Sequence, residues 1–248
     1  MSKRYKGKTC VYCADAISVT GDHVFAREFF LQNQRGNLPQ VPACERCNNK
    51  KSALEHYLTS VLPFGSMHTQ ATETLTRMVP KRLRANKKLH GVLRDGMTHT
   101  ESNGSRVGLL PMDGSSVTQL FEFIAKGLSW FHWGTLIEKS SVVSAMALTR
   151  VGVVFFVERF FSLNAKARVE NSLGDRVFSY TGVQAMDTDQ ITIWLFEVYA
   201  GLRMTDEDDP KDYSNVVGVI TSPPGLKERV ASAFGLSQAT QSVVPTDR

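Results

Sequence analysis

Residues 10–30, CVYCADAISVTGDHVFAREFF, place two cysteines, an aspartate and a histidine ahead of an apolar run. A second C-x-x-C pair occupies residues 44–47, and these two pairs hold all four cysteines of the chain. Structural zinc takes four tetrahedral ligands, and two tight C-x-x-C turns supply four thiolates. Four unrelated buried thiols are the alternative. We expect one closed structural zinc site, with the ligands Cys10, Cys13, Cys44 and Cys47.

A closed zinc site leaves Asp22 and His23 without a place in its coordination shell. Taken singly, an aspartate after glycine is typical of a turn, and a lone histidine is typical of a surface or core position. The residue after the last cysteine is Asn48, which begins a segment with helical apolar spacing over residues 48–62. Closing the zinc site would draw the segment after Cys13 toward the start of that helix. A second polar site is therefore expected beside the first.

The combined pattern C-x-x-C, D-H-V, C-x-x-C-N-x-x-K over residues 10–51 resembles the zinc-stapled branch of the HNH (ββα-metal) endonucleases. The resemblance implies a small ββα-metal, treble-clef-like module over residues 8–62. It implies that His23 is a general base that takes a proton from water. It also implies that Asp22 and Asn48 hold one catalytic Mg²⁺ or Mn²⁺ ion. An imidazole and a hard cation with oxygen ligands suit phosphodiester hydrolysis at neutral pH.

The sequence departs from the family at one position. Many members carry an asparagine five residues before the third cysteine, where it braces the loop of the catalytic histidine, but this chain has Pro39 there. Asn37 either serves that purpose through a longer loop or is an ordinary turn residue. The sequence leaves both alternatives open.

Basic residues surround the expected site. Arg27, Lys50 and Lys51 are candidates for phosphate contacts, and Lys51 matches the lysine of the family motif. For Arg27 and Lys50 a solvated surface position is equally compatible. Residues 67–96 form a strongly basic helical bridge that either extends an anionic track or presents a solvated face.

The rest of the chain predicts a separate α+β domain at residues 107–235 with a mainly antiparallel sheet. Residues 96–105 have the composition of a linker, and residues 115–137 of an amphipathic helix. Apolar, strand-like runs occupy residues 141–161, 176–186, 191–204 and 215–222, a final helix is expected at 223–234, and a disordered tail at 236–248. No catalytic motif is evident in this part.

The positive charge is concentrated near the N-terminus. Residues 1–95 carry 16 of the 29 Lys and Arg residues but 7 of the 24 Asp and Glu residues. This favours a polyanionic partner, and we expect nucleic acid, with DNA favoured over RNA. A homodimer or a regulatory partner through the C-terminal domain is left open. No apolar run reaches the roughly 18 residues of a membrane span, and no secretory signal is evident, so we expect a cytoplasmic protein without membrane contact.

The sequence therefore predicts a metal-dependent HNH endonuclease that hydrolyses phosphodiester bonds. The alternative is a zinc-stapled protein that binds nucleic acid without cutting it. The two differ in whether Asp22, His23 and Asn48 are needed.

Overall fold

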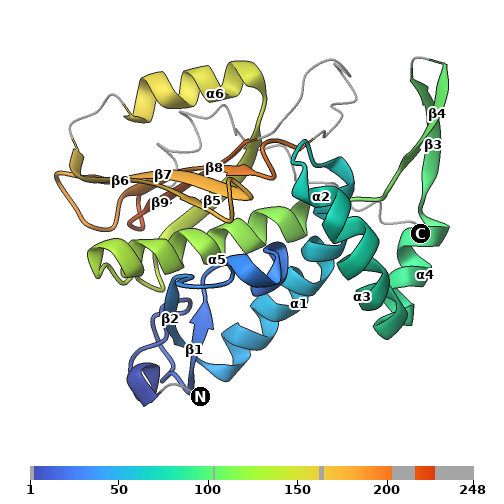
Figure 1. Ribbon diagram of the computed structural model, residues 1–248. Coiled ribbons are helices and arrows are strands. Elements are labelled where there is room, and N and C mark those ends of the chain that lie inside the picture. The colour runs from blue at the N-terminus through green and yellow to red at the C-terminus, as the bar shows by residue number, and fades with distance from the viewer. Residues whose placement is uncertain (1–2, 103, 162–164, 203–215, 227–248) are drawn as a thin grey trace, which may run out of the picture.

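The computed structural model describes residues 3–102, 104–161, 165–202 and 216–226 (Figure 1). Its α-helices are α1 (Glu45–Val61), α2 (Gln70–Glu73), α3 (Val79–Ala85), α4 (Lys87–Asp95), α5 (Gly114–Trp133) and α6 (Arg150–Phe156). Its strands are β1 (Thr20–His23), β2 (Gln40–Ala43), β3 (Thr98–Ser102), β4 (Ser105–Leu109), β5 (Val142–Leu148), β6 (Ala165–Leu173), β7 (Phe178–Ala185), β8 (Thr192–Val198) and β9 (Val216–Ser222). The tail predicted at 236–248 and most of the final predicted helix lie outside the described residues.

The N-terminal part has the order β1, β2, α1. Strands β1 and β2 pair antiparallel, and their register sets His23 opposite Gln40. Gly21 lies within β1, and a 3₁₀ turn at Arg27–Phe29 follows the strand. Phe25, Phe29 and Phe30 are all buried. A half-buried strand would turn the adjacent Phe29 and Phe30 toward opposite faces, so burial of both is not compatible with a strand here.

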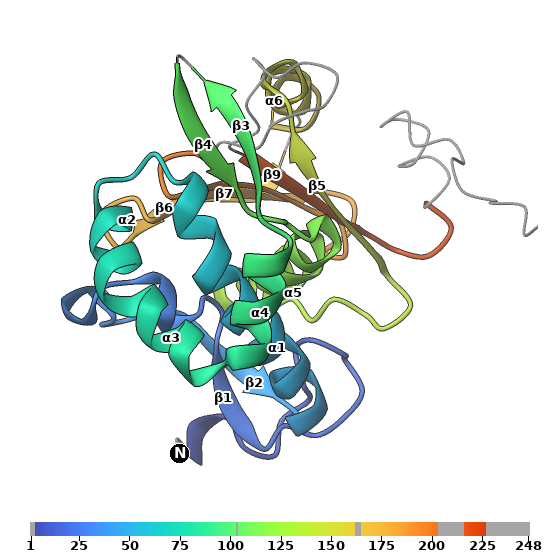
Figure 2. The ribbon, with the colours of Figure 1, turned by 90° about the vertical axis from the view of Figure 1, so that its right-hand side faces the viewer.

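The basic bridge is helical, as predicted. It consists of α2, a π-helical turn at Thr74–Met78, α3 and α4. Pro80 lies at the start of α3, where a missing N–H breaks no helical hydrogen bond. The linker predicted next is instead the antiparallel hairpin β3–β4, which projects from the body of the molecule (Figure 2).

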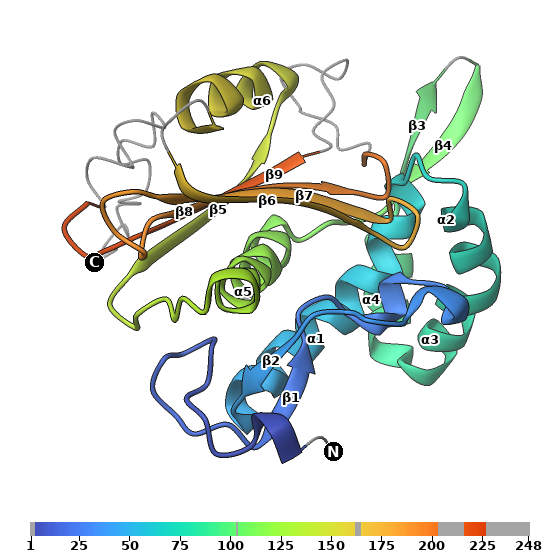
Figure 3. The same ribbon diagram turned by 60° about the vertical axis from the view of Figure 1, so that its left-hand side comes forward.

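The C-terminal part is an antiparallel sheet in the strand order β5-β9-β8-β7-β6. Helix α5 covers one face of this sheet, and α6 lies on the other (Figure 3). The predicted α+β class with a mainly antiparallel sheet is therefore confirmed. The strand expected across residues 141–161 ends at Leu148, because the Thr149 side chain accepts a hydrogen bond from Gly152 N–H and caps α6. Among the helices that the structure describes, none combines the length and apolar character needed to cross a bilayer.

One hydrophobic core joins the N-terminal part to the sheet. The rings of Phe25 and Phe178 lie 4.9 Å apart between centroids, and Phe121 of α5 belongs to the same cluster. Helix α5 lies between the sheet and the β1–β2–α1 unit (Figures 1 and 3). The boundary predicted near residue 107 therefore separates two parts that share their packing.

One close approach within this core is at Gly127 of α5. A Cβ atom there would lie 2.9 Å from Cγ2 and 3.0 Å from Cγ1 of Val24, the residue after His23. Val24 and Gly127 are both buried. Glycine at position 127 is thus what allows α5 to approach the end of β1.

Replacement of Gly127 by alanine tests this contact. We expect Gly127→Ala to lower the free energy of unfolding by about 1–3 kcal/mol, because the added methyl group overpacks a filled core. The control is Gly91→Ala in α4, where an added Cβ meets nothing within 4 Å. That variant should be stabilised by roughly 0.5–1 kcal/mol through chain entropy. Urea denaturation of both variants measures the difference, and equal stability of Gly127→Ala and wild type would contradict the assignment.

Candidate metal centre and adjoining polar site

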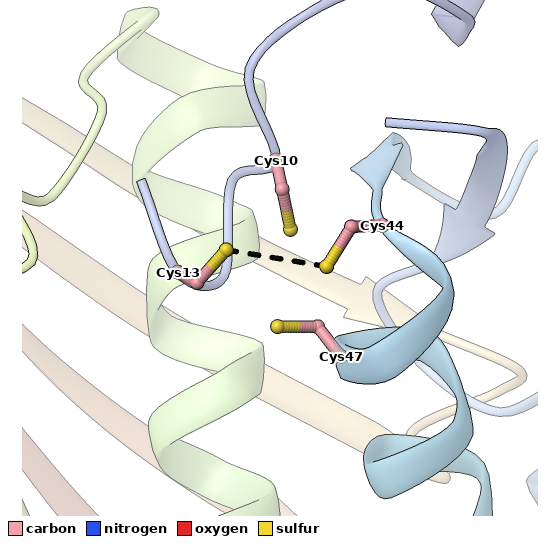
Figure 4. A group of neighbouring side chains, drawn as sticks. All are labelled: Cys10, Cys13, Cys44 and Cys47. Atoms are coloured by element: carbon pink, nitrogen blue, oxygen red, sulfur yellow. Dashed lines mark hydrogen bonds between the residues drawn. The ribbon is translucent and has the colours of Figure 1, made fainter. Parts of the chain in front are cut away.

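The four cysteine sulfurs lie within 4.8 Å of one another. Cys10 and Cys13 come from the N-terminal loop, Cys44 precedes α1, and Cys47 lies in its first turn (Figure 4). The sulfurs of Cys13 and Cys44 are 4.0 Å apart. Zn–S bonds of about 2.3 Å in a tetrahedron separate the sulfurs by roughly 3.8 Å. The group could hold a metal ion such as zinc.

The local backbone forms the first cysteine pair into a tight turn. Cys10 N–H donates to the carbonyl of Ala16 at 2.8 Å, and Ala14 N–H donates to the carbonyl of Cys10 at 2.9 Å. Burial raises the pKa of Cys10 and Cys47. Burial also raises the pKa of Cys13, but hydrogen bonds from backbone N–H groups outweigh it and lower this pKa to about 7. Metal binding would require these thiols to lose their protons.

Asp22 is held by two partners on one carboxylate oxygen. Its Oδ2 accepts the hydroxyl of Tyr12 at 2.6 Å and lies 3.1 Å from Nζ of Lys51. The described hydrogen bonds and ion pairs of this carboxylate all use Oδ2. Tyr12 belongs to the first cysteine turn, so the cysteine group and Asp22 are directly connected through one side chain.

The burial of Lys51 contradicts its predicted contact with a substrate phosphate. Its side chain is 0% exposed, so it cannot contact a substrate phosphate as predicted. Its ammonium donates to the carbonyl of His23 at 2.7 Å and forms ion pairs with Asp22 and Glu55. A buried ammonium needs such partners, because its charge is otherwise costly to desolvate. Lys51 is thus a structural cation that ties α1 to β1.

The carboxyl of Glu55 shares Lys51 with Asp22 and is 14% exposed. Burial raises the pKa of Glu55 to about 7, against the opposing effect of the Lys51 charge, and the nearby Asp22 raises it further. Glu55 therefore changes its charge near neutral pH.

The imidazole of His23 is held by Gln40, its register partner on β2. The Nε2 atoms of the two side chains lie 2.8 Å apart. As the Gln40 amide is placed, its Nε2 donates to Nε2 of His23. The oxygen and nitrogen of an amide are alike in shape, and with the amide turned the oxygen would accept Nε2–H and leave Nδ1 as a base. Burial lowers the pKa of His23, and the charge of Arg27 lowers it further while Asp22 opposes. The neutral imidazole is favoured at neutral pH.

Asn48 is half-buried and precedes Lys51 by one turn of α1. Residues three apart share a helix face, so Asn48 lies on the side of α1 that Lys51 turns toward Asp22. Arg27 is exposed and near His23, as its effect on the His23 pKa indicates. Lys50 is exposed on the opposite side of α1 from Asn48, with its Nζ 6.0 Å from the ring centroid of Phe123.

Asn37 is a turn residue. It is exposed and has a φ of 57°, a left-handed conformation that asparagine tolerates well. Within the described residues, no hydrogen bond from its side chain to the His23 segment is present. The His23 segment is held instead by Lys51 at its carbonyl, by Gln40 at its ring, and by the carbonyl of Pro39, which accepts Val24 N–H at 2.8 Å.

One basic residue of the bridge, Arg82, is occupied by contacts within the protein. Arg82 donates to the carbonyl oxygens of Thr59 and Glu28, both at 2.6 Å, so it fastens α3 to the N-terminal part. The other basic residues of the bridge are exposed, namely Arg77, Lys81, Arg84, Lys87, Lys88 and Arg94.

Comparisons with protein-family models, curated protein sequences and solved structures found no match. The function therefore has to be inferred from the side chains of this site.

The Glu55 carboxyl generates a pH prediction. Its folded pKa of about 7 lies above the ordinary value of 4.5, so the folded state retains a proton that the unfolded chain loses. The stabilisation that this extra proton gives the folded state is complete below the ordinary pKa of 4.5 and is lost as the pH rises through about 7. Glu55→Gln keeps an acceptor for Lys51 without titrating. Between about pH 5 and pH 8, we expect wild type to lose on the order of 2 kcal/mol of unfolding free energy relative to Glu55→Gln.

Denaturant titrations of wild type and Glu55→Gln across this pH range measure that difference. Exposed Glu101 provides the control, because Glu101→Gln should follow wild type at every pH. A constant difference between wild type and Glu55→Gln would show that Glu55 does not titrate in this range.

Proposed function

We propose that the protein is a metal-dependent HNH endonuclease that cleaves phosphodiester bonds in nucleic acid, with DNA as the expected substrate. The observation that carries the proposal is the held imidazole of His23, on a strand whose neighbour Asp22 lies against the Asn48–Lys51 face of α1. In this proposal, residues 8–62 form a ββα-metal module of treble-clef type. The order β1, β2, α1 and the four cysteines around its ends support it.

The donor set beside His23 fits a hard divalent cation. Asp22 offers Oδ1, and Asn48 offers a carboxamide oxygen, which are the ligand types that Mg²⁺ and Mn²⁺ prefer. When bound, the ion would stabilise negative charge on the phosphate and on the leaving 3′ oxygen. The positive charge of Lys51 beside Asp22 weakens ion binding by the free protein, so a substrate phosphate would complete the site.

His23 supplies the proton transfer. Burial keeps its imidazole neutral, so a ring nitrogen can take a proton from the attacking water. Gln40 fixes the ring through its contact with Nε2, and with the Gln40 amide turned the basic nitrogen would be Nδ1. The family mechanism would leave a 5′-phosphate and a 3′-hydroxyl. Exposed Arg27 is placed to contact a phosphate near the histidine.

A second candidate function has an observation in its favour. The carboxylate of Asp22 already has a cation and a hydroxyl on one oxygen, as a purely structural aspartate would. This favours the alternative of a zinc-stapled protein that binds nucleic acid without cleaving it.

The closed cysteine group is proposed to hold structural zinc. We expect one zinc per chain by elemental analysis, and loss of both zinc and the cooperative unfolding transition in Cys44→Ser with Cys47→Ser. Replacement of zinc by cobalt should give the visible absorption of a tetrahedral tetrathiolate site. An octahedral cobalt spectrum, or unchanged stability of the metal-free chain, would overturn the assignment.

Cleavage separates the two candidate functions. Wild type is incubated with single-stranded, duplex, nicked and branched DNA and with RNA, with Mg²⁺, with Mn²⁺ and with a chelator. We expect metal-dependent cutting and a loss of about 10²–10⁴-fold in His23→Ala, the usual contribution of a general base. Because the pKa of His23 is lowered, the acid limb of the pH–rate profile should lie below the ordinary histidine value of about 6.5.

His56→Ala is the matched control, because His56 is exposed on α1 and lies outside the proposed site. It should cut as wild type does. Equal cutting by His23→Ala and wild type would exclude His23 as the base. Binding without cutting of any substrate by wild type would establish the non-catalytic alternative.

A further inference from the structure

A cavity of about 400 Å³ lies between α1 and α5, and the proposed site does not use it. We name it the α1–α5 cavity. Its helical lining includes Arg46, Lys50, Gln119, Glu122, Phe123 and Lys126. Tyr12 and Cys47 also line it, so the cavity adjoins the cysteine group, beside which helix α5 passes (Figure 4).

The cavity carries an excess of positive charge. Three cations from two helices line it, Arg46, Lys50 and Lys126, against the single carboxyl of Glu122. Within the described residues, none of the three cations has an ion-pair partner within 4.0 Å. Lys126 is anchored by its hydrogen bond to the carbonyl of Tyr12 at 3.2 Å. Convergent cations with no carboxylate oxygen within 4.0 Å are suited to an anion with several acceptor oxygens.

The remaining polar groups narrow the class of anion. Gln119 and Glu122 present a carboxamide and a carboxyl in the same cavity. Both accept hydrogen bonds from hydroxyl or amino groups. A ligand that satisfies the whole lining therefore joins a phosphate to a group that donates hydrogen bonds. A nucleotide has both.

The cavity lies on the other side of α1 from the proposed catalytic site. Arg46 and Lys50 are each two residues from Asn48, which at 3.6 residues per turn places them about 160° around the helix. A helix with its side chains is about 10–12 Å across. The two sites are thus one helix apart, and a single strand of nucleic acid can contact both.

We propose that the α1–α5 cavity binds a phosphate group of a nucleotide, held by Arg46, Lys50 and Lys126. This deepens the proposed function by assigning a second contact to the nucleic-acid strand, away from the bond to be cut. It also changes the role expected of Lys50. This residue would contact a phosphate in the cavity and not one beside His23. The same chemistry is present in a polynucleotide and in a free mononucleotide.

Binding without catalysis tests the proposal. Wild type and Arg46→Gln with Lys50→Gln are titrated against a fluorescent single-stranded DNA 12-mer by anisotropy, and against a mononucleotide by calorimetry, without added Mg²⁺ or Mn²⁺. Both residues are exposed, so the substitutions should not disturb the core. We expect about five- to tenfold weaker 12-mer binding, and a salt dependence whose slope falls by about 1.4 for two lost phosphate contacts.

The control variant, Lys166→Gln with Arg176→Gln, removes the same charge from the β6–β7 side of the sheet. It should bind the 12-mer as wild type does. Loss of mononucleotide binding alone in the cavity variant would support the cavity and identify a free nucleotide as its ligand. Equal loss in both double variants, or no loss in the cavity variant for either ligand, would overturn the proposal.

The outcome is separable from that of the nuclease proposal. Weakened binding by the cavity variant together with no cleavage by wild type would retain the cavity and reject the nuclease. Cleavage that depends on His23, with unchanged binding by the cavity variant, would retain the nuclease and reject the cavity.

Discussion

An ammonium group with no access to solvent has to be neutralised where it lies, and Lys51 is neutralised by Asp22 and Glu55. These partners come from β1 and from the next turn of α1, so the buried charge fixes the distance between the strand and the helix. The same ammonium also binds the carbonyl of His23. The relative positions of Asp22, Glu55 and the His23 carbonyl follow from this requirement. The cysteine group is connected to the same strand and helix. Tyr12 of the first cysteine turn binds Asp22 of β1, and Cys47 lies in the first turn of α1.

Charge competition within this network bears on the chemistry that the site can perform. A carboxylate shared with an ammonium is a weaker ligand for a divalent cation than a free one. A protonated Glu55 leaves Lys51 with fewer negative partners, which draws the ammonium more strongly to Asp22. Ion affinity at Asp22 would then depend on the state of Glu55, a residue that touches neither His23 nor Asn48 in the described contacts. Asp22 and the buried ion pairs of Lys51 are one electrostatic unit.

The sequence was sufficient for features that depend on local spacing. Two C-x-x-C pairs predict the cysteine group, and apolar spacing predicts α1 and α5. Spacing could not show that Lys51 is buried, because a lysine is usually exposed and its burial depends on a strand distant in sequence. Its partner Glu55, four residues on, was a visible signal, since such pairs face each other on a helix. Gln40 was beyond reach, because its place opposite His23 depends on the register across a 16-residue connection. The hairpin β3–β4 has the Ser, Thr, Asn and Gly composition of a linker, and only pairing between its strands distinguishes the two.

The contact between Val24 and Gly127 restricts which residues can replace either one. The strand that carries His23 is seated directly on a helix that belongs, by sequence position, to the C-terminal part. A side chain added at position 127 would have to be matched by a smaller residue at position 24. Exchange of residues 8–62 between related chains would therefore move His23 without the helix that its neighbour Val24 contacts, unless α5 were exchanged as well. The two segments, about a hundred residues apart in the sequence, are therefore coupled through their packing.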